Sequence, residues 1–260
     1  GDYERELYNK LNIKAKNIYP IGNLRWANFL HHIKSENHSH ERYNSDICLI
    51  SEYVDSSYLH ASDIFDKHTK KKVNNPKLAE NINLIKGFVG VVKYTIKFCI
   101  RNNMKLIIPL KRDKKLTAKL HEAEYEYYKK NLKKEEFDYV QKSFLEKDRD
   151  DFSSFRAVLN SKVAIGVSTT LLMDKLGIGG KILHCNFTKQ NIFNFPINGI
   201  CTLNNFSYEE FEKRLLEIYS ISKENFLSKM DKKPGYVMKF NENNSTINLI
   251  REKLSQLGMN

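Results

Sequence analysis

The sequence predicts an α/β protein with a Rossmann-like, doubly wound parallel sheet. Short apolar runs, typical of strands buried on both faces, alternate with segments in which apolar residues recur every three or four positions. This alternation predicts crossover connections, and therefore a parallel sheet with helices on both of its faces. The expected strands are residues 46–51, 105–110, 137–141, 163–167, 181–185 and 199–203.

The helices expected between and around these strands follow the same patterns. The longest begins at Pro76, because proline suits the first turn of a helix, and its apolar stripe runs from Ile82 to Cys99. Shorter helices are expected at residues 4–11, 26–33, 117–132, 153–159, 208–219 and 247–257. The polar segments 37–45 and 52–75 are expected to be loops.

The composition indicates a globular protein with an anionic partner. The 260 residues are 41% hydrophobic, enough for a core, and the formal net charge is +12. That surplus suits a nucleotide, an anionic phospholipid surface or nucleic acid. Nucleic-acid binding is a candidate on charge alone, and we expect none, because no recognised motif with interleaved aromatic residues supports it.

The four cysteines indicate where the protein works. They lie in separate apolar segments without C-x-x-C spacing, which is typical of buried free thiols in a reducing compartment. No apolar run approaches the length of a membrane span. We therefore expect a cytoplasmic protein, and the positive charge leaves peripheral contact with an anionic inner membrane open.

Residues 160–188 are the stretch around which the chain is organised. They are expected to form a strand, a sharp turn, a helix and a second strand. Ser168, Thr169 and Thr170 stand where the helix begins, and such a start attracts anions through its unpaired N–H groups. Asp174 lies one turn further on, and Lys175 is expected opposite the apolar face of the helix. The stretch predicts a phosphate site, although the same residues are also ordinary helix N-caps.

Parallel sheets of this kind bind ligands beyond the carboxyl ends of the strands, where the strand order reverses. The expected first strand ends at Ser51 and Glu52, which would face Ser168 across that crevice. Lys111 and Arg112 follow the second strand and add positive charge, unless they belong to a solvated loop.

Three common motifs are missing from this crevice. The first turn lacks the glycines of G-x-G-x-x-G, which argues against NAD or FAD. No G-x-x-x-x-G-K-[ST] motif indicates a P-loop, and Thr170 replaces the second glycine of a serine-hydrolase elbow.

Three segments resemble the C-terminal, donor-binding half of GT-B glycosyltransferases, especially those of bacterial surface-carbohydrate and capsule biosynthesis. N-I-Y-P-I-G-N-L-R at residues 17–25 is similar to the segment that joins the two GT-B domains. K-L-I-I-P-L-K-R-D at residues 105–113 resembles the second donor-domain strand with its basic end. Residues 161–183 resemble the donor-phosphate motif, in which Asp174 takes the place of a carboxylate that often holds the ribose or sugar. Many relatives have Glu there.

The resemblance implies a function and a domain organisation. It implies a glycosyltransferase that moves a sugar from a nucleotide sugar to a growing surface polysaccharide or glycolipid, with no metal and no cofactor. CMP-, UDP- and GDP-linked donors all stay open. Residues 1–30 would be the end of an N-terminal domain and the interdomain linker, 31–235 the nucleotide-sugar-binding domain, and 236–260 a C-terminal helix packing back. An N-terminal acceptor domain or a partner chain would complete the enzyme.

The residues that perform acid–base chemistry are less well marked. Glu52 and His121 are the candidates, although residues of these types on loops and helix surfaces are usually solvated. Two other classes fit the same fold: a non-catalytic, nucleotide-sugar-binding partner subunit and a nucleotide-sugar 2-epimerase. The histidines at positions 31, 32, 38 and 40 suggest a metal site, but their spacing fixes no common face, and we expect none.

Overall fold

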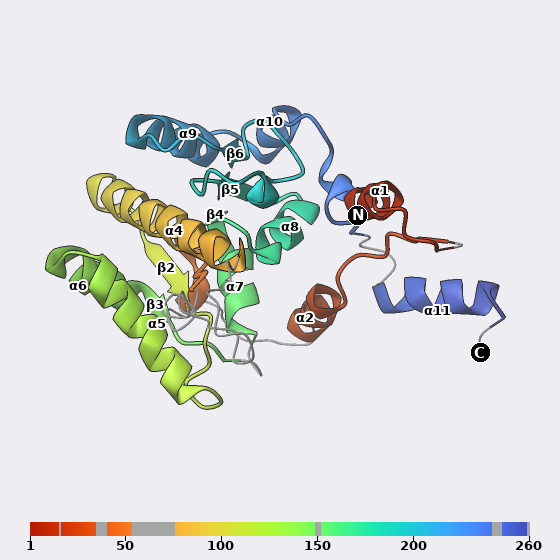
Figure 1. The fold of residues 1–260 in the computed structure, drawn as a ribbon, viewed down its shortest axis with the longest axis horizontal. Helices are drawn as coiled ribbons and strands as arrows, with labels where there is room; N and C mark the ends of the chain where they lie inside the picture. The colour runs from red at the N-terminus through yellow and green to blue at the C-terminus, as the bar shows by residue number, and fades with distance from the viewer. Residues whose placement is uncertain (16, 35–40, 54–75, 149–151, 241–245, 259–260) are drawn as a thin grey trace, which may run out of the picture.

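The structure is a computed structural model, and Figure 1 shows its fold. It describes residues 1–15, 17–34, 41–53, 76–148, 152–240 and 246–258. The charged segment 54–75 and the histidines at positions 38 and 40 lie outside the described residues, so the predicted loop over 52–75 is described only at its start.

The described residues form a sheet of six strands in the order β3-β2-β1-β4-β5-β6, and every pairing is parallel. The central strand is β1 (Ser45–Leu49), in which Ile47 pairs with Leu106 of β2 on one side and with Val163 of β4 on the other. The order reverses between β1 and β4, which creates a switch point at their carboxyl ends. The predicted doubly wound sheet is confirmed.

The other strands are β2 (Leu106–Pro109), β3 (Phe144–Leu145), β4 (Ser161–Gly166), β5 (Lys181–Cys185) and β6 (Thr202–Leu203). One predicted strand is wrong. Residues 137–141 belong to the helix α6 (Lys134–Ser143), and β3 follows it. Phe137 and Val140 are three positions apart and both buried, so they form one helical face. The carboxylate of Glu136 accepts a hydrogen bond from the Lys133 N–H at 2.9 Å and caps this helix.

Helices cover both faces of the sheet (Figure 1). On one face lie α4 (Pro76–Arg101), α6 and α9 (Tyr208–Ser220), and on the other lie α7 (Ser153–Asn160) and α8 (Thr170–Gly177). The long helix begins at Pro76 as predicted, and its stripe buries Val92, Ile96 and Cys99. All four cysteines are buried and free, as predicted.

Lys175 of α8 is buried instead of lying on a polar side. Its ammonium group donates hydrogen bonds to the carbonyl oxygens of Val158 and Ser161, both at 2.6 Å, and to the Ser161 hydroxyl at 2.7 Å. These bonds hold α8 against the corner between α7 and β4. They fix the position of the turn that precedes α8.

The first two helices and the last helix of the chain lie at one edge of the molecule (Figure 1). α2 (Leu24–Lys34) packs Trp26 and Phe29 against Phe155 of α7, with ring centroids 5.5 Å and 5.4 Å apart. α11 (Thr246–Gln256) contacts α2. Further elements are α1 (Asp2–Lys10), η1 (Glu41–Tyr43), α5 (Ala118–Asn131), η3 (Asn191–Phe193), α10 (Lys223–Ser228) and η4 (Pro234–Tyr236).

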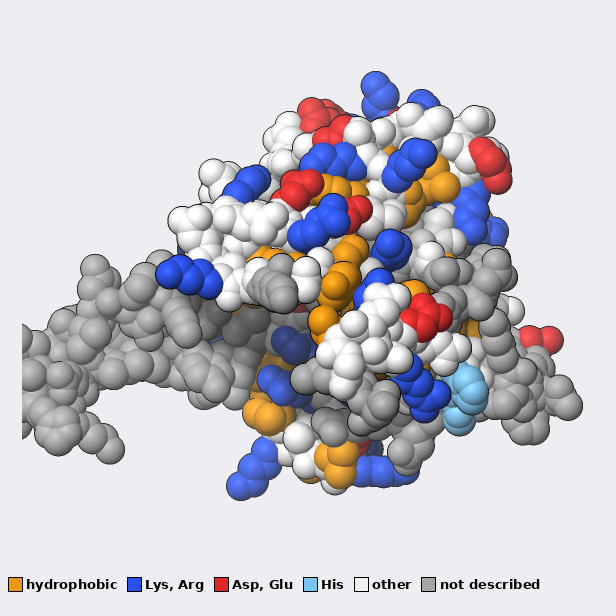
Figure 2. Space-filling model, turned by 90° about the vertical axis from the view of Figure 1, so that its right-hand side faces the viewer, with side chains coloured by type: hydrophobic (Ala, Val, Ile, Leu, Met, Phe, Trp, Pro, Cys, Tyr) orange, Lys and Arg blue, Asp and Glu red, His pale blue; other side chains and the backbone are white. Residues whose placement is uncertain are grey.

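The surface reflects the charge of the sequence. Figure 2 shows Lys and Arg side chains distributed over one face among apolar and acidic ones. Among the described helices, none combines the length and the apolar character that a membrane crossing requires.

Candidate functional site

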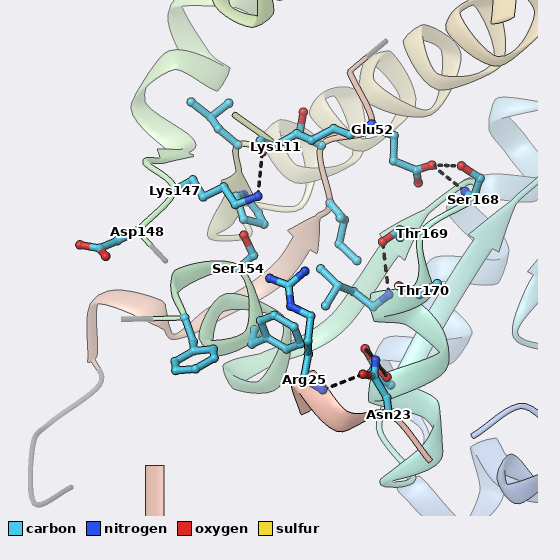
Figure 3. Close-up of a pocket in the computed structure, with 18 of the residues that line it drawn as sticks. Asn23, Arg25, Glu52, Lys111, Lys147, Asp148, Ser154, Ser168, Thr169 and Thr170 are labelled. Atoms are coloured by element: carbon cyan, nitrogen blue, oxygen red, sulfur yellow. Dashed lines mark hydrogen bonds between the residues drawn. The ribbon is translucent and has the colours of Figure 1, made fainter. Parts of the chain in front are cut away.

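A pocket of about 380 Å³ lies at the switch point of the sheet. Its walls come from the carboxyl ends of β1, β2 and β4, from the starts of α2 and α8, and from α7 (Figure 3). The lining residues are Asn23, Arg25, Ile50, Ser51, Glu52, Leu84, Pro109, Leu110, Lys111, Lys147, Asp148, Phe152, Ser154, Phe155, Ser168, Thr169, Thr170, Leu171 and Asp174. Ligands of doubly wound sheets bind at this place.

The turn after β4 contains the predicted hydroxyl cluster. Thr169 is the N-cap of α8, and its hydroxyl accepts a hydrogen bond from the Leu171 N–H at 3.3 Å. Ser168, Thr169 and Thr170 all line the pocket, so the structure brings these three predicted residues together. The sequence signal was a run of small hydroxyl residues between a buried strand and a helix.

A carboxylate of the protein already occupies part of this turn. Glu52 accepts hydrogen bonds from the Val167 N–H, from the Ser168 N–H at 2.6 Å and from the Ser168 hydroxyl at 2.6 Å (Figure 3). Burial raises the pKa of Glu52, and the hydrogen bonds from Ser168 and Val167 and the charge of Lys111 oppose that rise. Glu52 therefore places a carboxylate of the protein against donors that were expected to hold a phosphate.

The turn after β2 has a similar arrangement. Glu124 of α5 is fully buried, and its carboxylate accepts hydrogen bonds from the N–H groups of Lys111 at 2.9 Å and Arg112 at 2.8 Å, and from the Ser51 hydroxyl. The Tyr128 hydroxyl donates to the Ser51 oxygen at 2.8 Å and extends this network. Ser51 lines the pocket, but its hydroxyl is engaged behind the pocket wall.

Three cations line the pocket, and two of them donate to main-chain oxygens. The ammonium group of Lys111 donates to the Tyr53 carbonyl at 3.1 Å, and that of Lys147 donates to the Lys111 carbonyl at 2.9 Å. Burial and the neighbouring Arg112 lower the pKa of Lys111. The third cation is Arg25, from the start of α2. Arg112 is not among the lining residues, and its guanidinium carbon lies 6.0 Å from the centroid of the Tyr53 ring.

Asp174 lines the pocket and is paired with the segment that precedes α2. Its two carboxylate oxygens accept hydrogen bonds from the Asn23 amide nitrogen at 3.0 and 3.1 Å. Burial raises the pKa of Asp174 to about 6, against the effects of Asn23 and Arg25. In this structure, the position that the resemblance assigns to a ribose or sugar contact joins α8 to the segment before α2.

The histidines lie elsewhere. His121 of α5 is buried, and its Nε2 lies 2.6 Å from the carboxylate of Glu146; it is not among the residues that line the pocket. His31 and His32 belong to α2. Among the described residues, no group of His, Cys, Asp and Glu side chains has the arrangement of a metal site.

Several residues of the pocket were missed from the sequence. Asn23 and Arg25 belong to the G-N-L-R segment, whose resemblance to an interdomain linker gives no sign that it lines the pocket. Phe155 of α7, Glu124 behind the wall and Lys147 had no local signal. Their roles depend on strands that approach from distant parts of the chain.

A doubly wound parallel sheet with a polar pocket at its switch point defines a Rossmann-like fold. The model of a family described as "putative O-antigen biosynthesis protein" matches residues 5–254, and the chain belongs to this family. No curated protein and no solved structure matches the sequence. The family places the chain in surface-carbohydrate biosynthesis.

Proposed function

We propose that the protein is a glycosyltransferase of the GT-B type that moves a sugar from a nucleotide sugar to a growing surface polysaccharide or glycolipid. The observation that carries this proposal is a polar pocket at the switch point of a doubly wound sheet, in a chain of an O-antigen biosynthesis family. The nucleotide sugar would bind in this pocket. An acceptor domain or partner chain would close it from the opposite side.

The chemistry of transfer explains the charge of the pocket. The bond between the anomeric carbon and the donor phosphate breaks, and an acceptor hydroxyl oxygen forms the new bond and loses its proton. The nucleotide phosphate then carries additional negative charge, which preorganised donors and cations stabilise. The hydroxyls of Thr169 and Thr170 and the positive charge of the pocket lining would do so, without a metal.

The base that accepts the proton would come from the acceptor side. Glu52 is engaged by three donors in this structure, and His121 does not line the pocket. This observation also favours a second candidate, a non-catalytic partner subunit that binds the nucleotide sugar and completes a site in another chain. The two functions differ in turnover and share the binding step.

The partners of the reaction follow from the same proposal. A glycolipid acceptor would lie at a membrane surface, and the net charge of +12 suits peripheral contact with an anionic one. Sedimentation with vesicles of anionic and of neutral phospholipids would test this contact, and equal binding to both would contradict it.

Calorimetric titration of CMP, UDP and GDP into the protein tests the binding step. Thr169→Glu places a negative charge at the start of α8, and we expect it to weaken nucleotide binding about tenfold or more, because it repels the phosphate. The matched control is Ser207→Glu, since Ser207 is the N-cap of α9 and does not line the pocket.

The outcomes separate the two candidates. Nucleotide binding that Thr169→Glu leaves unchanged would place the phosphate elsewhere. Nucleotide binding with sugar transfer in the presence of an acceptor supports the transferase, and binding without transfer supports the partner subunit. Absence of nucleotide binding would remove both candidates.

A further inference from the structure

Four backbone N–H groups at the strand ends around this pocket already bind carboxylates of the protein. The N–H groups of Val167 and Ser168 bind the Glu52 carboxylate, and those of Lys111 and Arg112 bind Glu124. A phosphate placed against these four N–H groups would meet a carboxylate of the protein. Besides the hydroxyls of Thr169 and Thr170, the groups left to hold an anion are the side-chain cations of the lining.

Of the three cations that line the pocket, Arg25 differs from the others. Lys111 and Lys147 each donate to a main-chain carbonyl, which fixes their ammonium groups at the wall between β1 and β2. The guanidinium group of Arg25 has no hydrogen-bond partner within the part of the chain that the structure describes. Figure 3 shows it reaching from the start of α2 into the pocket.

The base of Arg25 is held firmly. Its backbone N–H donates to the Asn23 side-chain oxygen at 2.9 Å, and the amide nitrogen of the same Asn23 donates to Asp174. The guanidinium carbon lies 5.5 Å from the centroid of the Phe155 ring, which supports it from α7. Asn23 thus ties the residue to α8, and Phe155 supports it from the side.

We infer that Arg25 binds the phosphate or diphosphate of the ligand, on the side of the pocket formed by α2 and α8. A guanidinium group presents a rigid fork of donors that matches phosphate oxygens in pairs. Asn23 and Asp174 are positioning residues, because they act through the placement of Arg25. The identity of the anion as part of a nucleotide sugar rests on the proposed function, whereas the anion site itself does not.

The direct test uses inorganic pyrophosphate as the probe and calorimetric titration as the measurement. Arg25→Ala should lower pyrophosphate affinity about tenfold to a hundredfold, the usual loss for hydrogen bonds to a charged group. Arg25→Lys should restore only part of it, because a lysine keeps the charge and loses the fork.

The matched control is Arg101→Ala, which removes the same charge from α4. Arg101 forms an ion pair with Glu212 at 3.2 Å, and neither residue lines the pocket. Pyrophosphate affinity should be unchanged in this variant. An equal loss in both alanine variants, no loss in Arg25→Ala, or no binding by the wild type would each overturn the inference.

A double-mutant cycle tests the positioning role of Asn23. Asn23→Ala should lower pyrophosphate affinity when Arg25 is present. Added to Arg25→Ala, the same substitution should lower the affinity little further. Additive losses would show that Asn23 does not act through Arg25. Circular dichroism of each variant confirms that it is folded.

The same titrations distinguish failure of this inference from failure of the proposed function. If UDP, CMP or GDP binds the wild type and binds Arg25→Ala equally well, the nucleotide site stands and Arg25 is not its anion ligand. If pyrophosphate binding depends on Arg25 and no nucleotide binds, the anion site stands and the proposed function is wrong.

Discussion

The turns after β2 and β4 both bind their backbone N–H groups to a carboxylate of the protein, but the two carboxylates lie differently with respect to the pocket. In each, two successive backbone N–H groups at the carboxyl end of a parallel strand bind a buried glutamate. Glu124 reaches the β2 turn from α5, the helix that follows that turn in the chain, and lies behind the pocket wall. Glu52 reaches the β4 turn from the end of β1 and lines the pocket.

The position of each glutamate shows whether its carboxylate faces the pocket. Glu124 is sealed by the Ser51 hydroxyl and, through it, by Tyr128. Glu52 lines the pocket, and so do Thr169 and Thr170. The carboxylate of the β2 turn is therefore closed off from the pocket, whereas the carboxylate of the β4 turn lines it.

The largest change in the free energy of unfolding is expected at the β2 turn, whose carboxylate, Glu124, is closed off from the pocket. Glu124→Ala removes the acceptor of three donors in a dry environment and should lower the free energy of unfolding by about 3–5 kcal/mol. Urea denaturation measures this change. Glu126→Ala on the same helix is the control, because Glu126 is exposed and should change stability by less than about 0.5 kcal/mol. A loss near that of the control would show that the β2 turn does not need its carboxylate.

A smaller loss of stability, together with a higher affinity for pyrophosphate, is expected when the carboxylate of the β4 turn, Glu52, is removed. Glu52→Ala should lower the free energy of unfolding by about 2–4 kcal/mol, because water from the pocket can reach the Val167 and Ser168 N–H groups. Removing this negative charge should also raise pyrophosphate affinity about threefold to tenfold. Glu124→Ala, studied where it remains folded, should leave that affinity unchanged. Equal pyrophosphate affinities in both variants would contradict the prediction that only the carboxylate of the β4 turn affects binding in the pocket.

The smallest effect concerns the pH dependence of a third buried carboxylate, Asp174. Its pKa in the folded protein is about 6, raised by burial from 3.8, so the folded state binds more protons than the unfolded state between these values. The free energy of unfolding should therefore fall as pH rises from about 4 to about 6, by at most about 3 kcal/mol. Asp174→Asn should lack this fall, as denaturation at several pH values would show.

Asp46 provides a comparison of opposite sign. Burial raises its pKa, but hydrogen bonds from Tyr219, Lys105 and Lys162 outweigh that effect and lower the pKa below 3.8. Its contribution to stability is present above about pH 4 and is lost as pH falls through the folded pKa. The Asp46→Asn variant should therefore lose stability at neutral pH and approach the wild type in acid. Parallel pH profiles for the two aspartate variants would contradict the assigned signs.

The fold class and the hydroxyl run at the pocket could be predicted from local sequence patterns. The apolar runs that became β1, β2, β4 and β5 are buried on both faces of a parallel sheet, and such runs are legible without tertiary information. The hydroxyl run at residues 168–170 likewise marks a helix start, because capping is a local interaction. These signals depend only on neighbours in the chain.

Tertiary structure decided what local pattern left ambiguous. Phe137 and Val140 suit a short strand or one face of a helix, and packing of α6 against β2 selected the helix. Lys175 suits a solvated helix face, yet three acceptors from α7 and β4 bury it. Neither outcome could be predicted from the spacing of residues.

The hydrogen bonds that shape the pocket join residues that are far apart in the sequence. Glu52 and Ser168 are 116 positions apart, and Asn23 and Asp174 are 151 apart. A carboxylate in a sequence has no mark that tells whether it will contact a ligand or a backbone N–H group of its own chain. That choice depends on which strand ends the sheet brings together, because hydrogen bonds form only between groups within about 3 Å of each other.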